Sequence, residues 1–188
     1  MEVDYFLKLD GIQGESQDDK HKNEIELHSW SWGASNMGTS ASGGGGGAGK
    51  VSVSDFMVLK YIDKASPKLL EACTTGKPIS SAVLYCRKQG GSQQEYLKIT
   101  LTDVLVSGYD TQTGQSAGRR NHGANITTSR SNTQHNVANE PQWVPPVPME
   151  QFSLNFSKIE CEYKEQDNKG GLKGPVKTVW DVKANKAS

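Results

Sequence analysis

Long hydrophobic runs and a surplus of one charge are both missing from this chain of 188 residues. No apolar stretch approaches the roughly 20 residues that a membrane-spanning helix needs. Lysine and arginine together number 21, as do aspartate and glutamate, so the formal net charge is zero. We therefore predict no nucleic-acid partner and no membrane insertion, because binding to nucleic acid or to anionic lipid needs a basic patch.

A secretory signal peptide is also missing from the start of the sequence. Residues 1–9 alternate in polarity, whereas a signal peptide has a basic start followed by an apolar run. We therefore expect the chain to be made in the cytoplasm, with no classical secretion encoded in this segment.

Cysteine is scarce, and Cys73, Cys86 and Cys161 lie too far apart for a CxxC metal or redox motif. We expect them to be free, buried thiols, as is typical of a reducing compartment. The histidines show no spacing typical of metal ligands, and the GxSxG motif of many hydrolases is absent. The sequence therefore predicts no catalytic residue, no metal site and no cofactor.

A glycine-rich segment over residues 35–49 nearly contains a phosphate-binding loop, with Gly44, Gly49 and Lys50 in register. That motif needs Ser or Thr next and a helix after it, but Val51 follows and begins an alternating, strand-like pattern. Nucleotide binding is therefore not expected. Because glycine loses the most backbone entropy on ordering, we interpret the segment as a mobile loop.

Most of the remaining sequence alternates between apolar and polar residues with a period of two, which is typical of β-strands. The predicted strands cover residues 5–9, 24–32, 51–62, 82–88, 95–106, 149–163 and 176–182. One short helix is predicted over 66–75, where Ser66 can cap the start, Pro67 suits the first turn and Gly76 ends it. The predicted fold class is mainly β: a β-barrel of two sheets with one short α-helix.

The apolar face changes sides within residues 149–163. Phe152, Leu154 and Phe156 share one face, whereas Ile159 and Cys161 continue the apolar pattern on the other. Such a change is typical of a strand that bends between two sheets. It supports a barrel assembled from two sheets.

The composition shifts sharply between residues 111 and 148, which are rich in Asn, Ser, Thr and Gln and end in several prolines. A loop of this length without secondary structure is unusual inside a compact domain. We predict a single domain over residues 1–188 with a polar insertion at about 112–148 that is disordered or folds only against a partner.

Several separate segments resemble one family, in the same order along the chain. They are residues 3–8 (VDYFLK), 14–16 (GES), 30–33 (WSWG), 43–50, 65–69 (ASPKL), 95–101 (EYLKITL) and 154–156 (LNF). The family is Hcp, the hemolysin-coregulated tube proteins of the bacterial type VI secretion system. The likeness covers nearly all of the chain outside residues 111–148, where family members are usually shorter.

The resemblance implies a structural subunit without enzymatic activity that forms homo-hexameric rings. The rings would stack into an exported inner tube, contact sheath, baseplate and VgrG-type spike proteins, and carry effector proteins in the lumen. It places Ser31 in the lumen, and the polar face of the strand over 149–163 adds Gln151, Ser153 and Asn155 as candidate effector contacts. The loop residues Gly43, Gly44, Gly45, Gly46 and Gly47 are candidate contacts between rings or subunits.

Two other functions stay open on the residues alone. The chain could be a monomeric carbohydrate- or protein-binding β-module that uses the polar insertion for recognition. It could also be a β-barrel hydrolase that uses a pair of its scattered carboxylates. A large oligomer would favour the ring-forming subunit over both.

Overall fold

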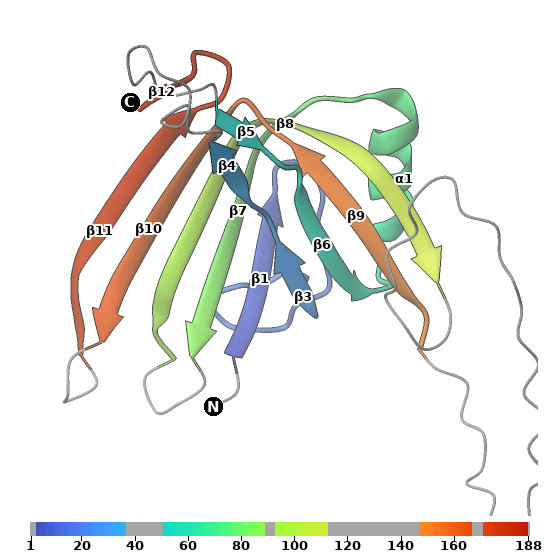
Figure 1. Ribbon diagram of the computed structural model, residues 1–188. Coiled ribbons are helices and arrows are strands. Elements are labelled where there is room, and N and C mark those ends of the chain that lie inside the picture. Colours follow the sequence, from blue (N-terminus) through green and yellow to red (C-terminus); the bar gives the residue numbers. More distant parts are fainter. Residues whose placement is uncertain (1–2, 37–50, 89–92, 113–146, 167–170, 188) are drawn as a thin grey trace, which may run out of the picture.

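The computed structural model describes residues 3–36, 51–88, 93–112, 147–166 and 171–187, which form β-strands and one α-helix (Figure 1). The predicted glycine loop Gly43–Gly47 and nearly all of the predicted insertion at 112–148 lie outside these ranges. In chain order the elements are β1 (Val3–Leu9), β2 (Ile25–Glu26), β3 (Ser29–Ser31), β4 (Ala34–Asn36), β5 (Val51–Val53), β6 (Phe56–Tyr61), α1 (Ser66–Thr75), β7 (Ile79–Lys88), β8 (Glu95–Gln112), β9 (Met149–Asn155), β10 (Lys158–Gln166), β11 (Leu172–Asp181) and β12 (Lys186–Ala187).

The strands form two main antiparallel sheets that share β8. Sheet A has the order β12-β11-β10-β8-β7-β1-β2, and sheet B has the order β3-β6-β9-β8. The first part of β8 pairs with β7 and β10, and its continuation from Leu105 onward pairs with β9. The strands β4 and β5 pair only with each other, as a small ribbon.

Two neighbouring chain segments bend together where sheet A meets sheet B. In β8, Asp103 adopts a positive φ of 52°. Ser157, in the short gap between β9 and β10, donates its backbone N–H to Thr102 O at 3.0 Å and its hydroxyl to Asp103 Oδ2 at 2.7 Å. The predicted bend within residues 149–163 is therefore confirmed, and it divides that predicted strand into β9 and β10.

On the other side of the core the two sheets are joined more weakly. The single strand predicted over 24–32 is divided into β2, which pairs with β1, and β3, which pairs with β6. Between them Leu27 donates its N–H to Tyr5 O at 3.0 Å, and His28 donates to Leu59 O at 2.8 Å. The predicted class, mainly β with two sheets and one helix, is confirmed, but the sheets do not close into a barrel because the ladder is interrupted here.

Apolar side chains from both sheets meet in one core. Sheet A contributes the directly paired Leu7, Leu84 and Ile99, all at most 2 % exposed. Sheet B contributes Phe56, which is fully buried and stacks on the Trp30 ring at a centroid distance of 5.6 Å. Burial of each such side chain stabilises the fold by about 1.5–3 kcal/mol relative to exposure.

Helix α1 packs against β8 at one side of the molecule (Figure 1). Pro67 in its first turn and Gly76 at its end, in the left-handed conformation with φ 64°, are as predicted. The predicted cap is wrong: Ala65 is the N-cap, and Ser66 is the first helical residue. The Ser66 hydroxyl instead accepts the N–H of Asp63 at 3.0 Å, so this serine stabilises the turn before the helix.

A buried ion-pair network lies between the helix start and sheet B. Lys60 and Glu150, both 0 % exposed, form an ion pair of 2.7 Å between β6 and β9. Lys60 also pairs with Asp63 at 2.7 Å, and the Tyr109 hydroxyl of β8 donates to Glu150. Burial, followed by the neighbouring Glu150 carboxylate, raises the pKa of Tyr109. The network joins three strands to the turn that begins α1.

The cysteines are free, as predicted, and Cys86 is buried, while Cys73 and Cys161 are half-buried. Burial raises the pKa of the Cys86 thiol to about 12. At neutral pH this sulfur therefore acts as a small apolar core group and not as a nucleophile. Among the described residues, no helix is long and apolar enough to cross a membrane.

Candidate functional site

The outer face of sheet B, which points away from the core, brings together the four predicted effector contacts. Ser31 pairs with Met57, and Met57 with Ser153, so the three side chains form one row across β3, β6 and β9. Gln151 and Asn155 have the same strand parity as Ser153, opposite to the buried Phe152 and Leu154. Their position on one accessible face is a structural result, and their role as effector contacts stays a prediction.

A hydrogen-bonded cluster organises one end of this face. The Asp55 carboxylate accepts from Asn155 Nδ2 at 2.8 Å and from the Ser107 hydroxyl at 2.5 Å. The Ser153 hydroxyl lies 2.9 Å from that of Ser107. The cluster combines three segments: strand β8, strand β9 and the residue directly before β6. Their hydrogen bonds hold these polar groups in position relative to one another.

Sequence reasoning missed Asp55 and Ser107 as members of this face. Ser107 occupies a bulge in β8, where the register with β9 shifts between Val106 and Gly108. A Cβ on Gly108 would lie 2.8 Å from the Ser153 hydroxyl, so glycine suits the close approach of the two strands. A glycine inside a strand pattern is a recognised signal of a bulge, and it was available in the sequence.

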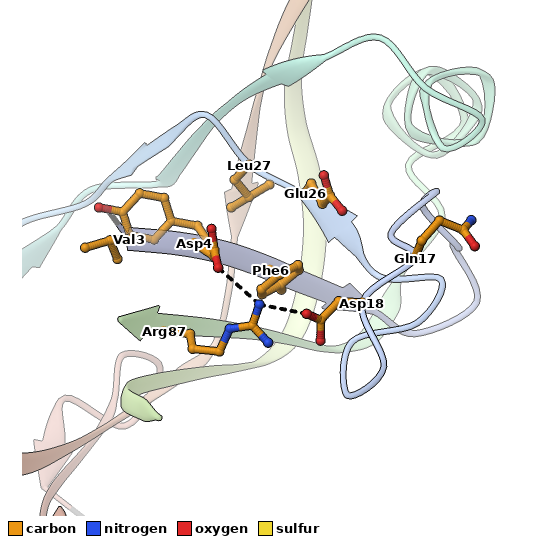
Figure 2. Close-up of a pocket in the computed structure, with 9 residues that line it drawn as sticks. Val3, Asp4, Phe6, Gln17, Asp18, Glu26, Leu27 and Arg87 are labelled. Atoms are coloured by element: carbon orange, nitrogen blue, oxygen red, sulfur yellow. Dashed lines mark hydrogen bonds and ion pairs between the residues drawn. The ribbon is translucent and has the colours of Figure 1, made fainter. Parts of the chain in front are cut away.

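The outer face of sheet A carries a hollow of about 350 Å³ beside β1 (Figure 2). Within it the Arg87 guanidinium pairs with Asp18 at 2.7 Å and with Asp4 at 3.1 Å, and lies 4.9 Å from the centre of the Phe6 ring. The hydrogen bond from Arg87 lowers the pKa of Asp18 to about 2. Because the charges are engaged with each other, this cluster fastens the loop between β1 and β2 to the sheet.

His21 reinforces the same attachment. Its ring is buried, stacks on Phe6 at a centroid distance of 4.3 Å, and places Nδ1 2.9 Å from Glu24 Oε2. Desolvation, opposed by His21, raises the pKa of Glu24. Packing on Phe6 and the contact with Glu24 account for the buried position of this histidine.

Apolar side chains are accessible along the side of the molecule formed by β10 and β11, which we call the β11 flank. Tyr163 is 44 % exposed and Val176 is 73 % exposed. Next to them, the ribbon β4–β5 and the strands β10–β11 enclose an apolar groove of about 280 Å³. The groove is lined by Trp32, Ala34, Asn36, Val51, Val53, Ile159, Cys161, Thr178 and Trp180.

A second apolar region lies around helix α1, across the molecule from β11 (Figure 1), and we call it the α1 flank. It includes Ile62 at 46 %, Leu70 at 47 % and Val147 at 64 % exposure. The N–H of Ile62 donates to Pro148 O at 3.2 Å, which keeps the segments that carry Ile62 and Val147 adjacent. The chain therefore presents apolar surface at two opposite sides.

Comparison with known proteins identifies the family. A family profile described as "Type VI secretion system effector, Hcp" matches residues 6–163. The chain belongs to the Hcp family. Among curated proteins, Protein hcp1 of Pseudomonas aeruginosa strain PAO1 is 43% identical over 187 residues, which cover 98% of both sequences. The resemblance drawn from the sequence segments is thus confirmed.

Solved Hcp structures share the fold. A structure titled "Structure of a type six secretion system protein" matches with a TM-score of 0.78 and 29% identity over 100% of both chains. Hcp1 from Salmonella typhimurium matches with a TM-score of 0.68 and 34% identity over 100% of both chains. A type VI secretion system effector from Yersinia pestis matches with a TM-score of 0.63 and 31% identity, over 95% of this chain and 99% of that one.

These matches assign the general function of the chain. It is an Hcp-type tube protein of type VI secretion, and Hcp is a family of structural secretion proteins, not of enzymes.

Proposed function

We propose that the chain closes with copies of itself into a hexameric ring, and that stacked rings form an exported tube that carries effector proteins. The observation that carries the proposal is the pair of apolar flanks at opposite sides of the subunit. A ring needs a heterologous contact, in which one side of each copy meets the other side of the next. The β11 flank of one subunit against the α1 flank of its neighbour supplies such a contact.

The apolar groove beside β11 offers a site into which side chains of the neighbouring subunit can insert. Its walls carry Trp32 and Trp180, and aromatic side chains in pockets are typical anchors of protein interfaces. Exposed aliphatic side chains such as Leu70 on the α1 flank are of suitable chemistry to enter it. Burial of both flanks would remove apolar surface from water on every subunit, which favours association.

If the two flanks form the contacts between neighbouring subunits, the outer faces of sheets A and B remain to form the outside of the ring and the lining of its channel. The resemblance places Ser31 in the lumen, and Gln151, Ser153 and Asn155 share its face, so sheet B would line the channel. This wall of hydroxyl and amide groups suits a water-filled passage for effector proteins. Sheet A would then face outward, toward the sheath.

The remaining partners follow from the family. The chain would be made in the cytoplasm and exported through the type VI system as a tube inside the sheath, with the spike protein at its tip and the baseplate as a further partner. Gly43–Gly47 would contact the next ring of the stack. These residues lie outside the described ranges, and what supports this contact is the length and glycine-rich sequence of the segment.

Size-exclusion chromatography with light scattering, followed by negative-stain electron microscopy, tests the ring. The wild-type protein is expected to elute as a large oligomer and to show rings. Val176→Lys on the β11 flank and Leu70→Lys on the α1 flank are each expected to shift it toward monomer, because each buries an unpaired charge in the contact. Both residues are exposed in the single chain, so the fold should persist, as circular dichroism can verify.

Gln13→Lys is the matched control, since it adds the same charge on the exposed loop after β1. It should leave the oligomer intact. A wild-type protein that stays monomeric at high concentration would contradict the proposal and restore the monomeric binding module as the better interpretation.

A further inference from the structure

We infer that the outer face of sheet B selects cargo by charge and takes polypeptides that present lysine or arginine to it. The inference rests on the proposed function only for the placement of this face in the lumen. Its basis is the separation of charged side chains between the two faces of sheet B.

The four strands of sheet B contain few charged residues. In β3, β6, β9 and the part of β8 from Leu105 onward, they are Lys60, Glu150 and Asp110. Lys60 and Glu150 point into the core, are fully buried and pair with each other at 2.7 Å. Asp110 pairs directly with Gln151 and is exposed on the outer face. The lysine of these strands is therefore in the core, where Glu150 neutralises it, and the Asp110 carboxylate is on the outer face.

Asp55, directly before β6, adds a second carboxylate to the same face. The hydrogen bonds from Asn155 and Ser107 engage one lone pair on each of its two oxygens, at 2.8 and 2.5 Å. Each carboxylate oxygen can accept a further hydrogen bond. Asp55 is thus held in position and can still accept from an ammonium or guanidinium group.

The other side chains of the face suit a basic side chain as well. Ser31, Ser153 and Gln151 offer hydrogen-bonding groups without positive charge. Met57 and Leu59 of β6 are half-buried on the same face, where Met57 pairs with Ser31 and Ser153, and Leu59 pairs with Gln151. Leu105 of β8 is 38 % exposed. Apolar patches of this kind accommodate the aliphatic stems of lysine and arginine, whose charged ends then reach the carboxylates.

In a ring, each subunit repeats the same two carboxylates around the channel. A wall with charge of one sign attracts the opposite sign and repels its own, and a confined channel strengthens this effect. Because salt screens exposed charges beyond about 8 Å at physiological ionic strength, the selection acts mainly on cargo in contact with the wall. Acidic polypeptides should therefore be disfavoured.

Fluorescence anisotropy with two labelled synthetic peptides of equal length tests the inference. One peptide alternates lysine with serine, and the other alternates glutamate with serine. Wild-type protein is expected to bind the lysine peptide more tightly than the glutamate peptide, and more weakly as salt is raised. In Asp55→Asn/Asp110→Asn, the affinity for the lysine peptide should fall about fivefold to tenfold.

The matched control is Asp19→Asn/Glu26→Gln, which removes two exposed carboxylates located on the loop between β1 and β2 and on β2 of sheet A. Its affinity should change less than about twofold. Equal binding of both peptides by the wild type, or an equal loss in the two double variants, would overturn the inference. Electron microscopy of each sample tests ring formation separately. If no rings form, the anisotropy titration still tests the charge preference, because the outer face of sheet B is accessible in the single chain.

Discussion

At the scale of single residues, the ion pair of Lys60 with Glu150 is the most consequential polar contact of the described core. Both side chains are fully buried, and the Glu150 carboxylate also accepts from Tyr109. Removing two charges from water costs free energy that offsets much of their mutual attraction, so the net contribution of the pair to stability is small. Removal of one partner alone is strongly destabilising, because the other charge is then buried without a counter-charge. It also fixes the register between β6 and β9, where Lys60 is directly opposite Glu150.

Lys60→Met is therefore expected to lower the free energy of unfolding by about 3–5 kcal/mol, because Glu150 is left charged and buried without its cation. Chemical denaturation at one fixed protein concentration measures the change. Lys68→Met is the control: Lys68 forms an exposed pair with Glu71 on α1, so its loss should change the stability by less than about 1 kcal/mol. Similar effects of the two substitutions would contradict the assigned role of the buried pair.

At the scale of elements, the loop between β1 and β2 is attached to sheet A through Asp18. Its Oδ2 pairs with Arg87 of β7 at 2.7 Å, and its Oδ1 accepts the N–H of Lys20 at 3.0 Å. The pKa of Asp18 is lowered from 3.8 to about 2, first because of the Arg87 hydrogen bond. The carboxylate form is thus the one that the folded state prefers.

The stability contributed by this contact should depend on pH in the acid range. A carboxyl group with a lower pKa in the folded than in the unfolded state stabilises the fold above its unfolded value. The contribution should therefore be present above pH 3.8 and decline as the pH falls toward about 2. The difference in unfolding free energy between wild type and Asp18→Asn, measured by denaturation across this interval, should shrink as the solution is acidified; a constant difference would contradict it.

At the scale of the whole molecule, two sheets, a helix and two apolar flanks make a subunit suited to self-association. Lateral contact through the flanks and axial contact between rings would use different parts of the chain. Deletion of Gly43–Gly47 is accordingly expected to leave single rings while it reduces their stacking into tubes. Electron microscopy of the purified variant distinguishes the two levels, and unchanged tubes would show that the glycine run is dispensable for stacking.

The local sequence pattern determined much of the secondary structure. Alternating polarity located the main strands, and Pro67 and Gly76 located the helix, because these features depend on neighbouring residues in the chain. The common face of Gln151, Ser153 and Asn155 could likewise be predicted from strand parity. Separated segments in a matching order were sufficient to predict the Hcp family.

Tertiary structure decided how those strands are joined. Whether residues 24–32 form one strand or two depends on competing hydrogen bonds from β1 and β6, and these partners are distant in sequence. The same holds for Asp55, which joins Ser107 and Asn155 only after three segments have been brought together. Periodicity reports which side of a strand is apolar, whereas sheet closure, bulges and polar clusters depend on contacts between segments that the local pattern does not encode.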